Sequence, residues 1–310
     1  MLAALNPSPD VWQFRPHPEV WLLVASLFGC YVYAMRAIGP NLVKVGQRVV
    51  TRKQLTAFAA GLLLLWLSSD WPMHDLGEQY LYSAHMLQHM ILSYFMPPLL
   101  LIATPEWLAR IVIGRGRAHR GVSWLAQPVV AGVIFTGWVM VTHIPGVVNS
   151  ASTHGAVFHY SLHVVLVLSS LLMWMPVCGP LPELRISAGA KMIYLFAQSI
   201  VPTVPAGWLT FADGVVYKVY DHQVRVWHLS VTDDQQLAGV IMKIGGSVYL
   251  WTLTTVLFFK RFMPNWEAEQ GFATRGRPPG AETASDREHT LTYDEVEEAF
   301  GREPAPVESD

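Results

Sequence analysis

Residues that can bind a metal ion lie close together near position 85. His85, Met86, His89 and Met90 occur within an apolar run from Leu81 to Ala103. In a helix, the two histidines lie one turn apart on one face, and the two methionines form a second stripe rotated from it by about 100°. Two imidazoles at this spacing can bind one ion, and thioethers beside them favour a soft ion such as Cu(I). The alternative is that the histidines hydrogen-bond between helices and the methionines pack in the interior.

The composition is that of an integral membrane protein. Of the 310 residues, 52% are hydrophobic and only 14% are charged, and the mean hydropathy is +0.31. An ordinary soluble domain has about 25% charged residues. A formal net charge of −2, without a basic stripe that contains aromatic residues, gives no sign of nucleic-acid binding. Cys30 and Cys178 are too far apart for a CxxC site, and two cysteines exclude a disulfide framework.

Seven stretches are apolar enough to cross a bilayer as helices, although the first two are short for this purpose. They are Val20–Met35, Leu55–Ser69, Leu81–Ala103, Leu125–Thr142, Ala156–Val177, Ala188–Phe211 and Gly239–Phe259. The predicted fold is therefore an all-α, polytopic membrane bundle of seven transmembrane helices. It divides the chain into an irregular lead-in (1–19), the membrane domain (20–262) and a tail (263–310). The tail is rich in Glu, Pro and Gly, which predicts disorder, and residues 292–300 could form a short helix.

The distribution of basic residues predicts the orientation of the bundle. Most Lys and Arg residues follow the first, third, fifth and seventh stretches. Because cytoplasmic loops carry the excess of positive charge, we expect the amino terminus outside and the carboxyl terminus in the cytoplasm. Ten of the twelve histidines then lie in outer loops or in the outer halves of helices.

Two pairs of histidines are predicted at matching depth on different helices. At 1.5 Å per residue, His85 and His89 lie about 6 and 12 Å below the outer end of the third helix. His159 and His163 lie about 5 and 11 Å below the outer end of the fifth. Ionisable groups within a membrane are costly and usually face the bundle interior, so the four imidazoles should converge.

Other polar residues near the same level extend this set. His143 closes the fourth stretch and would cap the cluster. Asp70 and His74, at the outer end of the second stretch, could orient a ligand imidazole through hydrogen bonds. The predicted metal site is His85, His89, His143, His159 and His163. Met86, Met90, Asp70 and His74 are auxiliary candidates, although the histidines suffice and the two methionines could simply pack.

Several motifs in this order resemble the bacterial CtaG-type assembly factors of cytochrome c oxidase. They are HMLQHM (85–90), Pro97-Pro98, Thr142-His143-Ile144-Pro145, His159 and His163 before Trp174-Met175-Pro176, and Asp234–Gly239. The resemblance covers about Trp21 to Phe262. It implies a multi-span protein of the bacterial plasma membrane that helps to mature a haem-copper oxidase, has oxidase subunits as partners and is not an enzyme. It also implies a copper-related role and marks the five histidines as characteristic positions.

The resulting hypothesis is that the outer-leaflet histidines bind copper transiently and pass it to an oxidase subunit in the membrane. One alternative is a metal-free scaffold that holds oxidase subunits during assembly. Another is a haem protein in which histidines of the third and fifth helices are axial ligands. A membrane metalloenzyme is disfavoured, because such sites usually add carboxylates and the apolar stretches contain almost none. No catalytic residue is predicted.

Overall fold

The computed structural model describes residues 10–44, 46–153 and 155–275 of the chain. Within these ranges all regular secondary structure is helical and no strand occurs, which confirms the predicted all-α fold. The described residues up to Phe259 form one compact unit, and a second unit begins at Lys260. The predicted short helix at 292–300 lies outside the described residues.

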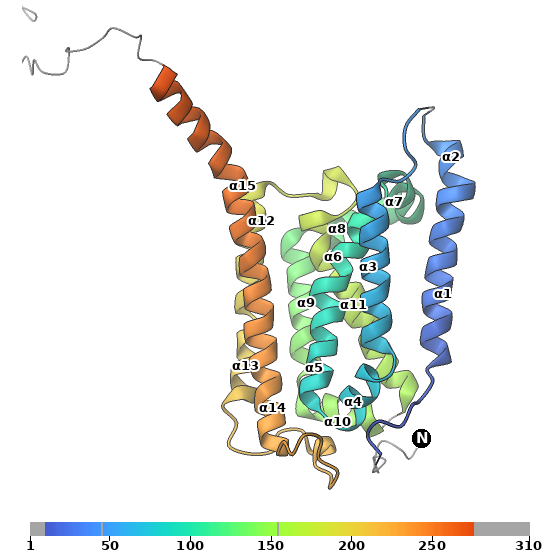
Figure 1. The fold of residues 1–310 in the computed structure, drawn as a ribbon, viewed down its shortest axis with the longest axis vertical. Coiled ribbons are helices and arrows are strands. Elements are labelled where there is room, and N and C mark those ends of the chain that lie inside the picture. Colours follow the sequence, from blue (N-terminus) through green and yellow to red (C-terminus); the bar gives the residue numbers. More distant parts are fainter. Residues whose placement is uncertain (1–9, 45, 154, 276–310) are drawn as a thin grey trace, which may run out of the picture. The chain divides into compact units, whose positions relative to one another are not determined.

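Helical segments, some of them made of two successive helices, lie side by side in the bundle, and shorter helices lie at its ends (Figure 1). The segments are α1 (Pro18–Tyr33) with α2 (Gly39–Leu42), α3 (Arg52–Ser69), α5 (Tyr82–Met90) with α6 (Met96–Ala103), α9 (Pro128–Thr142), α11 (Ala156–Cys178), α12 (Ala188–Ile200) with α13 (Thr203–Thr210), and α14 (Val231–Val240) with α15 (Gly246–Arg275), which belongs to the bundle as far as Phe259. The helices at the ends are α4 (Met73–Gln79), α7 (Glu106–Ile113), α8 (Arg117–Leu125) and α10 (Pro145–Thr153). We call the end with α4 and α10 the α4 end; α7 and α8 lie at the other end.

Among the described residues, five helical segments are long and apolar enough to cross a membrane. They are Pro18–Leu42, Tyr82–Ala103, Val157–Cys178, Ala188–Thr210 and Val231–Met263. A sixth is obtained if α8 and α9, which meet at 68°, count as one broken span. Helix α3 occupies the predicted second span but does not meet the same criteria. The membrane-helix character is confirmed, whereas seven spans and their orientation stay predictions.

Two of these helices continue past prolines. The third stretch was predicted to pass Pro97 and Pro98 and does so, whereas the first was predicted to end at Met35 but continues past Gly39 and Pro40 to Leu42. A π turn over Ala34–Ile38 directly precedes this proline, and a second one over Ile91–Phe95 precedes Pro97 and Pro98. Proline cannot donate a backbone hydrogen bond, and its ring clashes with the carbonyl four residues back. The wider π turn removes that clash, so each helix continues.

The last long helix begins earlier and ends later than predicted. It starts at Val231 rather than Gly239, because Ser230 caps it by accepting a 3.1 Å hydrogen bond from the backbone N–H of Asp233. It also continues helically beyond Pro264, where the disordered tail was predicted, to Arg275. The loop before this helix, predicted to reach Ala238, therefore ends at Ser230, and Asp234 belongs to helix α14.

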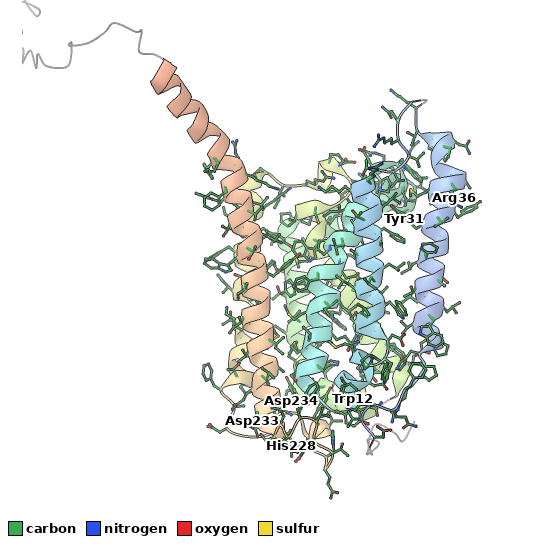
Figure 2. All side chains as sticks on the ribbon, viewed as in Figure 1. Trp12, Tyr31, Arg36, His228, Asp233 and Asp234 are labelled. Atoms are coloured by element: carbon green, nitrogen blue, oxygen red, sulfur yellow. The ribbon has the colours of Figure 1, made fainter. Side chains whose placement is uncertain are left out.

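Asp234 fixes the start of the helix that carries His85 and His89. Its carboxylate accepts hydrogen bonds from the backbone N–H groups of Tyr82 (2.6 Å) and Ser83 (3.1 Å), and from the Ser83 hydroxyl. Asp234 is buried at the α4 end, beside the exposed Asp233 and away from Arg36 (Figure 2). The first N–H groups of a helix have no partner within it, so this carboxylate caps α5 from the last long helix of the bundle.

A second contact fixes the middle of the same helical segment. The indole N–H of Trp174, on α11, donates a 3.0 Å hydrogen bond to the carbonyl of Ser93, within the π turn that follows α5. Trp174 is 1% exposed. This bond sets the register of α11 against α5, and therefore the relative height of the two histidine pairs.

The break between α12 and α13 is closed by a lysine of the last helix. Pro202 and Pro205 interrupt the backbone hydrogen bonds there, which frees carbonyl groups that need partners inside the membrane. The ammonium group of Lys243 donates to the Thr203 hydroxyl (2.6 Å) and to the Ser199 carbonyl (3.4 Å). The lysine thus provides hydrogen-bond donors for polar groups at the break between the two helices.

Candidate metal centre

Five histidines surround or adjoin one small cavity near the α4 end. His85 and His89 project from α5, His159 and His163 from α11, and His143 directly follows α9. The cavity has a volume of about 30 Å³ and is lined by His85, His89, Thr142, Val147, Val148, Ala151, His159, Leu162, His163 and Tyr220. This space suffices for an ion or one water molecule.

The imidazole rings are in mutual contact. The ring centroids of His85 and His89 are 4.4 Å apart, and those of His159 and His163 are 4.5 Å apart. Across the two helices, His85 lies 5.8 Å from His159 and 5.5 Å from His163, and His89 lies 4.9 Å from His163. His143 contacts His89 at 6.4 Å. The structure therefore brings all five predicted histidines together.

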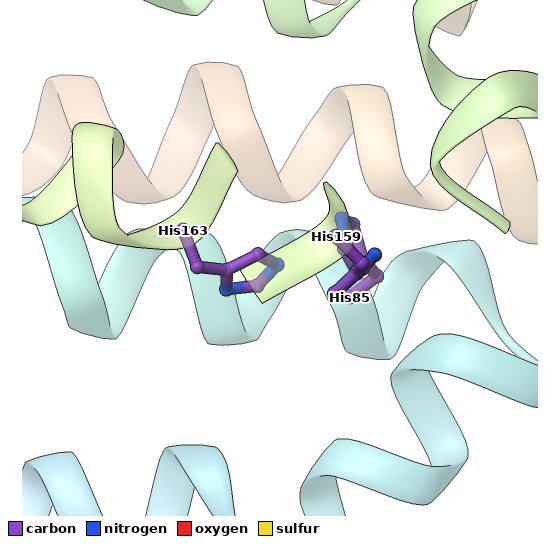
Figure 3. Close-up of side chains that lie close together, drawn as sticks. All are labelled: His85, His159 and His163. Carbon is purple, nitrogen blue, oxygen red and sulfur yellow. The ribbon is translucent and has the colours of Figure 1, made fainter. Parts of the chain in front are cut away.

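Three of these histidines can direct nitrogen atoms toward one point. One ring nitrogen from each of His85, His159 and His163 lies within 4.8 Å of the other two (Figure 3). Nitrogen ligands of one tetrahedral ion, bound at about 2.0–2.1 Å, lie about 3.3 Å apart. Small side-chain rotations would therefore bring the three nitrogens to an ion, and His89 and His143 lie next to them.

Four buried ring nitrogens of this cluster have neither a hydrogen-bond partner nor an ion-pair partner among the described residues. They are Nδ1 of His85 and Nε2 of His89, His143 and His163. The other nitrogen of His143, Nδ1, lies 2.6 Å from the carbonyl of Val139 on its own helix. The alternative of hydrogen bonds between helices therefore does not account for these nitrogens. Because an unpaired buried polar group is costly, nitrogens of this kind point to a ligand.

A carboxylate that the sequence analysis did not identify reaches the same cluster. Oε1 of Glu78, on α4, lies 2.5 Å from Nε2 of His159 and 3.2 Å from Nε2 of His74. Burial opposes ionisation of Glu78, but the hydrogen bond with His159 and the nearby histidines hold its pKa below the ordinary value. Glu78 follows His74 by four residues, and residues at this spacing lie on one face only in a helix. The sequence analysis did not predict helix α4 and therefore did not connect Glu78 with His74.

His74 takes the auxiliary position that the sequence predicted. Its ring centroid lies 6.2 Å from that of His159, and its Nδ1 lies 3.2 Å from the side-chain nitrogen of Gln88. Burial lowers the pKa of His74, an effect that the charge of Glu78 opposes. Whether His74 orients a ligand imidazole stays a prediction.

The other auxiliary candidates lie elsewhere. The Asp70 carboxylate accepts hydrogen bonds from the indoles of Trp21 and Trp66, both 2.7 Å, and from the backbone N–H of Trp71 (2.8 Å). No described hydrogen bond joins it to a histidine, so it ties α1 to α3 instead. Met86 packs in a cluster with Tyr82 and Tyr217, and Met90 packs against Gly246. Neither methionine lines the cavity, since the turn of the helix places both on another face.

Residues 29–263 match the family described as the cytochrome c oxidase caa3 assembly factor (Caa3_CtaG). The chain belongs to this family. The match confirms the resemblance carried by the histidine motifs and covers the helices that form the candidate metal centre. No curated protein and no solved structure matches the chain. The family makes this assembly factor a protein that serves the maturation of cytochrome c oxidase.

The hydrogen bonds of Asp70 predict a pH-dependent contribution to the stability of the assembly factor. Burial raises the pKa of Asp70, but hydrogen bonds from Trp21, Trp71 and Trp66 outweigh it and lower the folded-state pKa. We expect Asp70→Asn to reduce the free energy of unfolding by about 2 kcal/mol at pH 7. Because the folded pKa is depressed, this loss should be constant above about pH 4 and decline as the pH falls through the folded value.

The measurement is thermal unfolding in detergent between neutral and acidic pH, followed by tryptophan fluorescence. Trp66→Phe is the matched variant: it removes one donor and should cause a smaller loss with the same pH dependence. A loss that grows toward acidic pH would contradict the assignment.

Proposed function

We propose that this assembly factor binds one copper ion through His85, His159 and His163 and delivers it to the oxidase. The observation that supports this most strongly is the cluster of five imidazoles, two buried and three half-buried, around a cavity of ion size, with four of their buried ring nitrogens unpaired among the described residues. His89 and His143 supply further imidazoles next to the three. Surplus ligands favour a carrier, because an ion can exchange between neighbouring imidazoles instead of being held permanently.

The chemistry of the donor set favours copper over hard cations. Imidazole suits copper, zinc, iron and nickel, whereas magnesium, calcium and manganese prefer carboxylate and carbonyl oxygens. All ionisable side chains that line the cavity, apart from Tyr220, are histidines. Among the metals that suit imidazole, copper is the one that a haem-copper oxidase needs besides its haem iron. Such a role needs no catalytic base, so we propose that the protein is not an enzyme.

The cavity size favours an ion over a haem. A volume of about 30 Å³ holds an ion or a water molecule but not a porphyrin. His85 and His163 also lie with ring centroids only 5.5 Å apart, without room for a macrocycle between them. A metal-free scaffold would leave the buried nitrogens unpaired, and the experiments below distinguish it from a carrier.

We further propose that the bundle crosses the bacterial plasma membrane seven times, with the α4 end outside. Helix α3 packs along α6, and its 18 residues span about 27 Å at 1.5 Å per residue, close to the thickness of the hydrocarbon core. The loops that carry most of the Lys and Arg residues then face the cytoplasm. The histidine cluster lies in the outer leaflet.

Cysteine labelling tests this orientation. In a Cys30→Ala, Cys178→Ala background, a single Asp213→Cys change marks the loop 211–230, and a single Arg117→Cys change marks the opposite end. We expect a membrane-impermeant maleimide to label position 213 in intact cells and position 117 only after permeabilisation. The reverse pattern would contradict the proposed orientation, and labelling of both positions in intact cells would contradict the number of spans.

Metal analysis tests copper binding. We expect purified protein supplied with Cu(I) to retain close to one copper ion per chain, and the variant His85→Ala plus His159→Ala to retain almost none. The matched control is His119→Ala plus His228→Ala, which removes two imidazoles outside the cluster and should retain the wild-type amount. Equal copper in wild type and in the cluster variant would overturn the proposal, as would a Soret band showing bound haem.

Delivery to the oxidase is tested in cells that lack the assembly factor. The cluster variant should restore the amount of oxidase protein but not its copper, because the ligands are missing while the bundle remains. Copper and haem per purified oxidase are the measurements, with the His119→Ala plus His228→Ala control restoring both. A scaffold without metal would instead restore the copper content with either variant.

A further inference from the structure

A second set of metal-binding atoms lies beside the centre, around Glu78. Its Oε1 atom is 2.5 Å from Nε2 of His159 and 3.2 Å from Nε2 of His74. Two imidazoles and one carboxylate are ligand types that can together hold one transition-metal ion. His159 belongs to both sets, since its ring nitrogen also lies within 4.8 Å of those of His85 and His163.

Glu78 is the most exposed donor of this set. Its side chain is 29% exposed, that of His159 is 12% exposed and that of His74 is 5% exposed. Glu78 and His74 lie on α4, the short helix at the end of the bundle (Figure 1). His163 lies one turn further along α11 than His159, toward the middle of the bundle. An ion that arrives from the α4 end therefore meets Glu78 and His159 before His163.

We infer that copper enters through a loading site formed by His74, Glu78 and His159, and that His159 then transfers it to His85 and His163. This inference rests on the proposed function. In the transfer, the bonds from copper to Glu78 and His74 break and the bonds to His85 and His163 form, while the bond to His159 is kept. The oxidation state of copper does not change. Since the two sites share His159, the protein holds one ion at a time.

The two donor sets give this transfer a direction. A carboxylate attracts a cation through its charge. Oxygen is, however, a poorer ligand than imidazole for a soft ion such as Cu(I). Glu78 therefore captures the ion quickly and holds it weakly, and the inner site of three imidazoles retains it.

Stopped-flow loading tests the inference. The full-length protein in detergent is mixed with the coloured Cu(I) complex of bicinchoninate, and loss of colour gives both the rate and the amount of copper taken up. We expect Glu78→Gln and His74→Gln each to slow copper loading by about tenfold without changing the final amount of copper bound. Tenfold is the lower end of the effects that changes next to a metal ligand usually have. The matched control is Glu19→Gln, a side chain 50% exposed near the same end, which should load like wild type.

Each outcome bears on one of the two proposals. Slower loading of both variants with unchanged stoichiometry supports the loading site. Loading at the wild-type rate by both variants overturns it, while copper binding by wild type leaves the proposed function intact. Loss of copper from Glu78→Gln to the level of the His85→Ala plus His159→Ala variant also overturns it, because Glu78 would then belong to the resident site. If wild type takes up no copper, the proposed function itself is overturned.

Discussion

Burial of unpaired imidazole nitrogens is the constraint on which the rest of the structure depends. Each buried polar atom without a partner costs about 1–3 kcal/mol, and four such nitrogens lie within one cluster. Side chains in this situation would turn away or the helices would move apart, unless packing elsewhere held them. The contacts of α5 and α11 must therefore keep the cluster together at a cost in stability.

Two buried hydrogen-bonding groups supply that restraint from different parts of the chain. Asp234 holds the first turn of α5 by its backbone N–H groups, and Trp174 holds the turn that follows α5 by the Ser93 carbonyl. The second bond uses a π turn, where the helical backbone pattern is already altered. The same irregular turn lets the helix accommodate Pro97 and Pro98, so one local feature serves both continuity and alignment of the histidine pairs.

The sequence predicted the long apolar helices and the five histidines, because apolar length and depth counting depend only on spacing along one helix. It did not predict α4, which is too short and too polar to be recognised as a membrane helix. Glu78 was missed with it.

The sequence analysis also assigned Asp70 to the histidines, whereas three tryptophan N–H groups hold that carboxylate. A carboxylate near the outer end of a helix has many partners within reach, and only tertiary packing selects among them. The early start of α14, and with it the role of Asp234, depends on a single capping serine.

Depth along the bundle also orders the donor types. The Glu78 carboxylate lies on α4 at the end of the bundle, the imidazole of His159 comes next, and the imidazoles of His85 and His163 follow. A site of imidazoles alone, closed from water, would bind copper firmly but would accept it slowly, because an approaching ion meets no opposite charge. One carboxylate at the entrance supplies that attraction without adding a hard ligand to the inner site. In the proposed loading of copper, the short helix α4 is thus the element that would give an ion access to the histidine cluster.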